Sequence, residues 1–452
     1  MKKVLEHIKH IYFLGIGGIG MSALARYFMK KGIRVSGYDK TPSDLTSELS
    51  SEGAEIHFND DPSLIPHDID FIIYTPAVPK DLLEFETLAK SSIPMHKRAH
   101  VAGLVTKGKT TIAVAGSHGK TSISSLTAHI LKSAGYPVTA LIGGISRNYG
   151  SNFITSGQED IMIVEADEFD RSFLELAPDF AVISAMDPDH LDVYGTSEEM
   201  ESSFAEFVQR IKPNGHLVIR HDLQIPIRKD IHRTGYQVDN LAEAFAYNLR
   251  IGNGLQLFDM FIEGVRYTDI KLMVPGRHNV ENALAASLVC YQLGVKSKEI
   301  MNGIETFTGV KRRFDFRIRK EGLVYIDDYA HHPRELEAFI KAVREFYPGA
   351  RLTGLFQPHL FTRTRDFAEG FAASMDLLDE PWLLDIYPAR ELPIMGVTSA
   401  MILDKMQNPA KLLLSRAEVL QRLQQSKPEV FLTMGAGDID QMIIPIEKIL
   451  LQ

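Results

Sequence analysis

Residues 111–122, TIAVAGSHGKTS, place a short apolar run directly before a loop with two glycines, a lysine and several hydroxyl side chains. The run predicts a buried strand, and the residues after the loop have the spacing of a helix. In such a strand–loop–helix unit, backbone N–H groups cradle phosphates, the lysine reaches terminal phosphate oxygens and a hydroxyl can hold Mg²⁺. Val114 stands where the full pattern has a glycine, so the loop is a shortened variant.

This loop, called the phosphate loop below, predicts binding of a nucleoside triphosphate. Its candidate binding residues are Gly116, Ser117, His118, Gly119, Lys120, Thr121 and Ser122.

A second glycine-rich loop, residues 15–20 (GIGGIG), lies near the start of the chain and is called the glycine loop below. It has the spacing GxGxxG between a predicted strand and a predicted helix, a pattern that lets backbone N–H groups approach a diphosphate. We therefore expect a diphosphate-bearing ligand, of open identity, at Gly15, Gly17, Gly18, Ile19, Gly20 and Asp39. The same fingerprint is typical of NAD-dependent dehydrogenases, but two phosphate-binding loops in consecutive segments argue against hydride transfer.

Predicted strands and helices alternate along almost the whole chain, which indicates an α/β fold. The 452 residues correspond to about three domains. Changes in pattern place the predicted boundaries so that the domains cover residues 1–107, 108–308 and 309–452.

The composition excludes several functional classes. With 49 basic and 58 acidic residues the net charge is −9, so nucleic-acid binding is not expected. No apolar run approaches the ~18 residues of a membrane-spanning helix, and the first residues lack a secretory-signal pattern. Cys290 is the single cysteine, which excludes a disulfide framework. We expect a cytoplasmic protein without a membrane partner, either a monomer or a homodimer.

Carboxylates gather after two predicted strands of the middle segment. Glu165 directly follows the strand at 161–164 and is the first of several acidic residues there. A carboxylate at a strand end beside a phosphate loop is where a metal ligand is expected, so we select Glu165. In Asp187-Pro188-Asp189-His190 the aspartates are either ligands or helix caps, and His190 is a further candidate ligand.

The last segment contains three clusters of basic and histidine residues, at 311–316, 327–333 and 357–365. Charged runs are usually solvated surface. However, the second and third clusters each lie where a predicted strand ends, which is the binding edge of an open α/β sheet.

Eight segments in order along the chain resemble the Mur ligase family. They are GIGGIGMSALA (15–25), GSHGKTS (116–122), EADEFDRSFL (165–174), DHLDVY (189–194), PGRHNVENALAA (275–286), RRFDF (312–316), DDYAHHP (327–333) and FQPHLFTRTRDF (356–367). The resemblance implies a Rossmann-like N-terminal domain for a UDP-sugar, a P-loop-type central ATPase domain and a Rossmann-like C-terminal domain for an amino acid. It also implies that the ligand of the glycine loop is UDP-N-acetylmuramate.

The implied reaction is ATP-dependent amide formation between the muramoyl carboxylate and L-alanine through an acyl phosphate. By the same resemblance, Lys120 contacts the terminal phosphates, and Mg²⁺ is held by Thr121, Glu165 and His190. The adenine is framed by His278, Asn279 and Asn282, while Asp328 contacts the ribose and Arg313 the transferred phosphate. The implied amino-acid pocket consists of His331, His359 and Arg363.

Three alternatives make different predictions. A related recycling ligase attaches the tripeptide L-Ala-γ-D-Glu-diaminopimelate to the same UDP-sugar. A dehydrogenase would bind NAD(H), and a regulatory nucleotide switch would bind ATP without amino-acid-dependent turnover. The chain also departs from sister ligases, because residues 195–210 contain no lysine that could serve as their carbamylated metal-bridging group.

Overall fold

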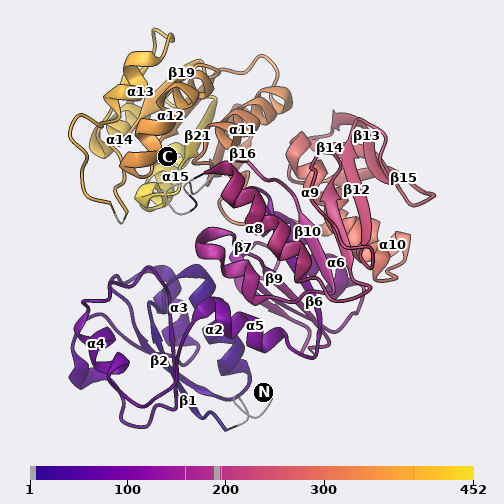
Figure 1. Ribbon diagram of the computed structural model, residues 1–452. Helices are drawn as coiled ribbons and strands as arrows, with labels where there is room; N and C mark the ends of the chain where they lie inside the picture. The colour runs from indigo at the N-terminus through magenta and orange to yellow at the C-terminus, as the bar shows by residue number, and fades with distance from the viewer. Residues whose placement is uncertain (1–6, 158, 188–193, 195, 390) are drawn as a thin grey trace. The chain divides into compact units, whose positions relative to one another are not determined.

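The computed structural model describes residues 7–157, 159–187, 194, 196–389 and 391–452. It contains three sheets, of five, ten and six strands, flanked by helices (Figure 1). The predicted α/β fold is therefore confirmed. Within the described residues, no helix combines the length and apolar character needed to cross a membrane.

The N-terminal sheet has the order β3-β2-β1-β4-β5, and its neighbouring strands are parallel. Because parallel strands end at the same edge, the loops after β1, β2 and β4 lie on one side of the sheet. Its strands are β1 (His10–Leu14), β2 (Arg34–Tyr38), β3 (Glu55–His57), β4 (Phe71–Tyr74) and β5 (Met95–Lys97). Its helices are α2 (Ile19–Lys30), α3 (Asp44–Ser51), η1 (Pro62–Leu64), α4 (Leu83–Ala89) and α5 (Arg98–Thr106).

The central sheet has the order β15-β14-β13-β12-β11-β10-β6-β9-β7-β8. Strands β6, β9, β10 and β11 run parallel, whereas β8 is antiparallel to β7. The strands are β6 (Thr110–Ala115), β7 (Val138–Ser146), β8 (Ser151–Thr155), β9 (Ile161–Glu165), β10 (Phe180–Ile183), β11 (His216–Arg220), β12 (His232–Val238), β13 (Ala244–Gly252), β14 (Leu255–Ile262) and β15 (Val265–Leu272). The helices are α6 (Lys120–Ser133), η2 (Phe169–Glu175), α8 (Ser197–Gln209), α9 (Arg277–Gln292) and α10 (Ser297–Thr306).

The C-terminal sheet has the order β16-β17-β21-β18-β19-β20, with only the β16–β17 pair antiparallel among the described strands. The strands are β16 (Asp315–Lys320), β17 (Leu323–Asp328), β18 (Leu352–Phe356), β19 (Glu380–Leu383), β20 (Leu412–Leu413) and β21 (Val430–Met434). The helices are α11 (Pro333–Phe346), α12 (Phe361–Met375), α13 (Ala400–Lys405), α14 (Arg416–Gln425), η3 (Asp438–Met442) and α15 (Ile443–Leu451).

The N-terminal and central sheets share one hydrophobic core. Phe13 of β1, Leu24 and Phe28 of α2 and Leu141 of β7 all belong to the same cluster of buried side chains. Helix α2 therefore packs on its own sheet and also against the β7–β8 hairpin. This shared core explains why the N-terminal sheet and strands β6–β12 of the central sheet lie in one compact unit.

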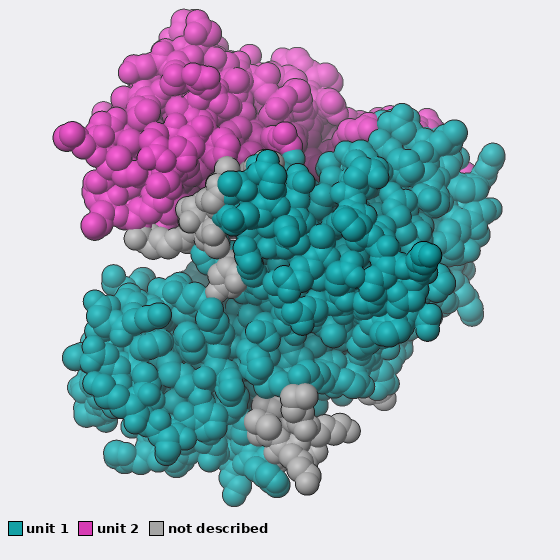
Figure 2. All heavy atoms as spheres, in the orientation of Figure 1, with its two compact units in different colours: residues 1–247, 260–267, 282–307 teal, residues 248–259, 268–281, 308–452 magenta. Residues whose placement is uncertain are grey.

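The chain forms two compact units (Figure 2). One contains residues 1–247, 260–267 and 282–307, and the other contains residues 248–259, 268–281 and 308–452. This division into units does not decide the predicted boundaries near residues 107 and 309, which stay predictions.

Candidate functional site

The phosphate loop follows β6 and opens α6, as predicted. Gly116 and Gly119 have φ of +130° and +85°, a backbone conformation that favours glycine. A Cβ on Gly119 would also lie 2.6 Å from Oδ1 of Asn282. The structure thus places Asn282 of α9, a predicted adenine residue, directly beside the loop.

The other loop residues are held by the end of β10 and the segment after it. Ser117 donates its hydroxyl to the carbonyl of Asp187 at 2.8 Å and its N–H to the carbonyl of Ala185 at 3.1 Å. The His118 Nε2 lies 3.3 Å from Oδ2 of Asp187. These bonds preset the shape of the loop before any nucleotide binds.

Lys120 is held by a buried carboxylate. Its Nζ donates to the carbonyl of Gly116 at 2.7 Å and to both carboxylate oxygens of Glu168 at 2.8 and 2.9 Å. Glu168 is only 1% exposed. Burial lowers the pKa of Lys120, but Glu168 and its acidic neighbours outweigh burial and raise that pKa above its ordinary value. Lys120 is therefore charged, and the position of its ammonium group is fixed by Glu168. Glu168 was not among the residues predicted from the sequence.

Glu165 and Thr121 present oxygen atoms next to Lys120. The Thr121 hydroxyl donates to Oε2 of Glu165 at 3.2 Å, and the Gly143 N–H donates to Oε1 at 2.5 Å. Burial raises the pKa of Glu165, against the opposing effects of Gly143 and Lys120. Mg²⁺ is usually bound by one or two carboxylates plus substrate phosphates, and these two side chains fit that donor set.

The predicted metal ligand His190 lies outside the described residues. In the described part of the chain, no group of three or more His, Cys, Asp or Glu side chains forms a metal cluster. The two oxygen donors Thr121 and Glu165 are thus the candidates that the structure brings together.

The glycine loop is shaped by Asp39. The Gly17 N–H donates to Oδ2 of Asp39 at 2.7 Å, and the Thr41 N–H donates to Oδ1 at 3.1 Å. A Cβ on Gly17 would lie 2.8 Å from the same Oδ2. Gly15 has φ +83°, and Gly18 precedes the first turn of α2. Asp39 therefore holds the loop in addition to lining the space in front of it.

That space is a hollow of about 650 Å³, called the outer hollow below. It is bordered by the glycine loop, by residues 38–43 after β2 and by residues 75–82 after β4. Its position at the carboxyl edge of a parallel sheet is the usual ligand position in open α/β folds.

A buried cluster of hydrogen-bonded side chains lies close to the outer hollow. The Tyr12 hydroxyl donates to Oε2 of Glu84 at 2.5 Å and lies 2.8 Å from Nε2 of His57. Asp60, which lines the hollow, accepts from the N–H groups of Leu83 and Glu84 at the start of α4. Burial of Glu84, which is 0% exposed, raises its pKa to about 7.

We expect replacement of Glu84 with glutamine to remove a pH-dependent part of the stability. The pKa of Glu84 is higher in the folded protein than its ordinary value of 4.5. Its stabilising contribution is therefore full below about pH 4.5 and is lost as the pH rises through about 7, on the order of 3 kcal/mol. The free energy of unfolding of Glu84→Gln minus that of the unchanged protein should therefore be larger at about pH 8.5 than at about pH 5. An unchanged difference at both pH values would contradict this.

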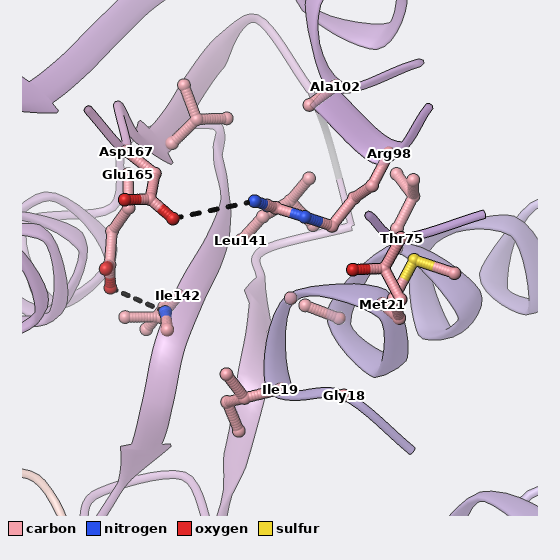
Figure 3. Close-up of a pocket in the computed structure, with 15 residues that line it drawn as sticks. Gly18, Ile19, Met21, Thr75, Arg98, Ala102, Leu141, Ile142, Glu165 and Asp167 are labelled. Atoms are coloured by element: carbon pink, nitrogen blue, oxygen red, sulfur yellow. Dashed lines mark hydrogen bonds and ion pairs between the residues drawn. The ribbon is translucent and has the colours of Figure 1, made fainter. Parts of the chain in front are cut away.

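A second hollow, of about 250 Å³, lies beside the glycine loop and reaches Glu165; it is called the inner hollow below (Figure 3). Its lining includes Ile19 and Gly20 of the glycine-loop region, Arg98 of α5, and Glu165 and Asp167 after β9. Nη2 of Arg98 lies 3.8 Å from Oδ2 of Asp167. The inner hollow thus lies between the glycine loop and the proposed metal carboxylate.

The position of Arg98 explains why a glycine is needed at Gly20, the last glycine of GxGxxG. A Cβ on Gly20 would lie 2.9 Å from Nη1 of Arg98 and 3.2 Å from its Cδ. Gly20 therefore makes room for a guanidinium that points across the inner hollow toward Asp167 (Figure 3). Neither Arg98 nor Asp167 was predicted from the sequence, although Asp167 belongs to the acidic residues that follow the strand at 161–164.

In the C-terminal sheet, the end of β17 carries two predicted residues. Asp328 accepts from the N–H groups of Phe314 at 2.6 Å and Ala330 at 2.8 Å, and burial raises its pKa to about 7. The guanidinium of Arg313 lies over the ring of Tyr329, 5.1 Å from its centroid. Asp328 therefore shapes the turn after β17, and Arg313 lies close to the same turn.

The predicted amino-acid residues come together at this edge. The rings of His331 and His359 meet edge to face at 6.1 Å, and Arg363 of α12 is 8% exposed. Nδ1 of His331 lies 2.9 Å from the carbonyl of Tyr329 and 3.3 Å from Oε2 of Glu335. Both partners only accept hydrogen bonds, so Nδ1 carries the proton and Nε2 is an acceptor. Burial lowers the pKa of His331 to about 4, which keeps the ring neutral.

The remaining predicted residues lie at the start of α9. The Asn279 amide donates to the carbonyl of Pro275 at 2.7 Å. A Cβ on Gly276 would lie 2.9 Å from Cε1 of His278. Both contacts help to define the turn that enters α9. Asn279 and His278 precede Asn282 by three and four residues on this helix.

These features define an α/β enzyme with a P-loop-type strand–loop–helix unit in its central sheet and a glycine-rich loop in its N-terminal sheet, and a hollow lined by the glycine loop and by Glu165. Family comparison agrees along the chain. Residues 10–110 match "Mur ligase family, catalytic domain", residues 114–290 match "Mur ligase middle domain" and residues 312–437 match "Mur ligase, glutamate ligase domain".

Two curated relatives are UDP-N-acetylmuramate–L-alanine ligases. That of Parabacteroides distasonis is 47% identical, over 99% of this chain and 98% of its own length. That of Flavobacterium psychrophilum is 48% identical, over 98% of both chains. The solved UDP-N-acetylmuramate–alanine ligase of Thermotoga maritima aligns with a TM-score of 0.82 and 27% identity over 98% of both chains. A murein peptide ligase from Psychrobacter arcticus, 20% identical over 98% of both chains, shares the fold with a TM-score of 0.71.

The chain belongs to the Mur ligase family. This membership confirms the resemblance noted from the sequence and, with it, the three-domain Mur ligase type of fold.

Proposed function

We infer that the protein joins L-alanine to the muramoyl carboxylate of UDP-N-acetylmuramate and uses ATP to drive the reaction. The observation that carries this inference is the inner hollow, which places the glycine loop and Glu165 around one small space. The full-length relatives with this activity support it. This activity belongs to the synthesis of peptidoglycan precursors, a cytoplasmic process.

A carboxylate is a poor acylating agent, so it must first be activated. One carboxylate oxygen of the substrate attacks the terminal phosphorus of ATP, ADP leaves, and an acyl phosphate forms. The alanine amine then attacks the acyl carbon and phosphate departs with that carboxylate oxygen, while the amine loses its proton. Catalysis of these steps consists mainly of positioning and charge neutralisation.

The residues of the inner hollow and the phosphate loop supply that neutralisation. Lys120 faces the terminal phosphates, and Arg98 supplies a cation beside the glycine loop. Mg²⁺, held by Thr121, Glu165 and His190, would supply further charge stabilisation on the phosphates. The substrate carboxylate then approaches the phosphate between Arg98 and Glu165.

We also propose the remaining assignments made from the family resemblance. The adenine is bound by His278, Asn279 and Asn282, the ribose by Asp328 and the transferred phosphate by Arg313. The domains are residues 1–107 for the UDP-sugar, 108–308 for ATP and 309–452 for the amino acid. The protein acts in the cytoplasm, as a monomer or homodimer, without nucleic-acid or membrane partners.

The alanine zwitterion has a binding group for each end. The Arg363 guanidinium can clamp the alanine carboxylate. The neutral His331 ring offers Nε2 as an acceptor for the alanine ammonium group. Glu335 maintains this arrangement because its Oε2 accepts from the backbone N–H of His331 at 3.0 Å and lies 3.3 Å from the ring Nδ1.

Replacement of Arg363 with alanine should raise the KM for L-alanine by about a hundredfold, because one charge-assisted clamp is lost. The KM for ATP should change by less than about threefold. Arg365→Ala is the matched control, because Arg365 lies on the same helix but is exposed and pairs with Asp366. Initial rates at varied alanine and ATP provide the test, and a selective ATP defect would remove Arg363 from the pocket.

The acceptor specificity separates this activity from that of the recycling ligase. The protein is incubated with ATP, Mg²⁺ and UDP-N-acetylmuramate, together with L-alanine, D-glutamate or L-Ala-γ-D-Glu-diaminopimelate. We expect a product heavier by one alanyl residue with L-alanine alone. A product formed only with the tripeptide would contradict the amino-acid assignment and favour the recycling reaction.

A further inference from the structure

Asn152, which the reaction scheme does not use, is a fully buried polar residue at the contact between the N-terminal and central sheets. It lies on β8, where the alternation of buried and partly buried positions turns it inward with Ile154. Its exposure is 0%. A buried amide must find hydrogen-bond partners to offset its desolvation.

All the partners of Asn152 lie on α2, the helix that follows the glycine loop. Oδ1 accepts from Nη1 of Arg26 at 2.5 Å. Nδ2 donates to the carbonyl of Ile19 at 2.6 Å and to the hydroxyl of Ser22 at 2.8 Å. Because arginine only donates and a carbonyl only accepts, the orientation of the amide is fixed. One acceptor and two donors are therefore satisfied by three groups of one helix.

These bonds act on the first turn of α2. Ile19 is the first residue of the helix and lines the inner hollow. The hydroxyl of Ser22 also donates to the Ile19 carbonyl, at 2.9 Å. The N–H groups of this turn are those that a glycine loop presents to a diphosphate. The orientation of this turn is consequently fixed by hydrogen bonds from Asn152 of the central sheet.

The same hairpin also contacts the metal carboxylate. β7, the partner of β8, donates the Gly143 N–H to Glu165. Leu141, Ile142 and Gly143 of β7 line the inner hollow. One hairpin thus supports the glycine loop through Asn152 and Glu165 through Gly143.

We propose that Asn152 is a positioning residue for the UDP-sugar, acting from the central sheet on the first turn of α2. This inference rests on the proposed function, because it takes the UDP-sugar as the ligand of the glycine loop. Asn152 itself is buried and acts through Ile19 and Ser22.

The chain offers a matched control at the other end of the same helix. Glu159 binds Nζ of Lys31 at 2.7 Å and Nζ of Lys109 at 2.6 Å. It therefore joins the same two sheets, about 18 Å along α2 from Ile19. Loosening this contact tests attachment of the helix without touching the glycine loop.

The first test compares Asn152→Asp with Glu159→Gln in the full chain. Asn152→Asp keeps an acceptor for Arg26 but places a carboxylate oxygen against the Ile19 carbonyl. We expect it to raise the KM for UDP-N-acetylmuramate about tenfold, with the KM for ATP within about twofold, and to lower the Tm, because a buried carboxylate oxygen then faces a carbonyl oxygen. Glu159→Gln should lower the Tm and leave both KM values unchanged. Equal KM changes in the two variants, or none in Asn152→Asp, would overturn the proposal.

A second measurement needs no substrate. Hydrogen–deuterium exchange of the amides of residues 22–26, whose N–H groups donate within the first turns of α2, should be faster in Asn152→Asp than in the unchanged protein and in Glu159→Gln. Equal exchange would overturn the positioning contact. If Asn152→Asp does not fold, Asn152→Ser is measured in its place with the same expectations. Absence of UDP-sugar-dependent turnover in the unchanged protein would instead contradict the proposed function, and the exchange result would still decide the contact.

Discussion

Replacement of Lys120 with alanine is expected to lower kcat by about three orders of magnitude or more. The Lys120 ammonium is the charge that the buried Glu168 holds at the phosphate loop, with distances of 2.8 and 2.9 Å to its two oxygens. Its loss removes a preorganised cation from the transferred phosphate. It also leaves the Glu168 carboxylate, which is 1% exposed, without its partner.

Affinity for the UDP-sugar should be nearly unchanged in Lys120→Ala, because the glycine loop belongs to another sheet. Lys132→Ala is the matched control, since Lys132 is at the far end of α6 and donates to the carbonyl of Thr155. Steady-state turnover and equilibrium binding of UDP-N-acetylmuramate measure the two effects. An equal loss of UDP-sugar affinity in Lys120→Ala would contradict the separation of the two sites.

Replacement of Arg98 with alanine should lower kcat/KM for the UDP-sugar by about two to three orders of magnitude. Among the residues that line the inner hollow, Arg98 is the cation, whereas Glu165 and Asp167 are acidic. A diphosphate sugar and an acyl phosphate both need positive charge there. Without Arg98, the two carboxylates would repel these anions.

Arg98→Lys keeps the charge but loses the planar fork, so it should recover part of the activity. His100→Ala removes a basic residue of the same helix that pairs with Glu175 outside the inner hollow, and it should behave like the unchanged protein. Initial rates at varied UDP-sugar measure these effects. A near-normal kcat/KM for Arg98→Ala would remove Arg98 from the reaction.

The conformations of the phosphate loop and the glycine loop were predictable from the sequence because their determinants are local. A short apolar strand, glycines with positive φ and a helix start within a few residues, so the order of residue types alone specifies the geometry. Gly15, Gly116 and Gly119 indeed have positive φ. The fold class followed from the same alternation of strands and helices.

Arg98 and Asn152 could not be found in this way, because their roles depend on contacts distant in sequence. Arg98 follows a short strand without any motif, and its effect depends on Gly20 and Asp167. Asn152 is a polar residue in a short strand, and only the structure shows it to be buried against α2. Long-range packing decides both positions.

Glu335 is an intermediate case. It lies one helical turn after His331 and bonds to it, a spacing at which helix neighbours meet. The sequence contained this signal, but the first turn of α11 also attracts acidic residues through the helix dipole. The hydrogen bond to His331 in the structure shows that Glu335 contacts the predicted amino-acid residues, in addition to any favourable interaction with the helix dipole.

The most direct test of the proposed reaction is the fate of the carboxylate oxygens of the UDP-sugar. We place the muramoyl carboxylate against the terminal phosphate of ATP, beside the inner hollow. UDP-N-acetylmuramate labelled with oxygen-18 in that carboxylate is turned over with ATP, Mg²⁺ and L-alanine, and the released phosphate is analysed by mass spectrometry. We expect one labelled oxygen in each phosphate released. Phosphate without label, formed at the same rate as the alanyl product, would contradict the acyl-phosphate route and the role given to the inner hollow.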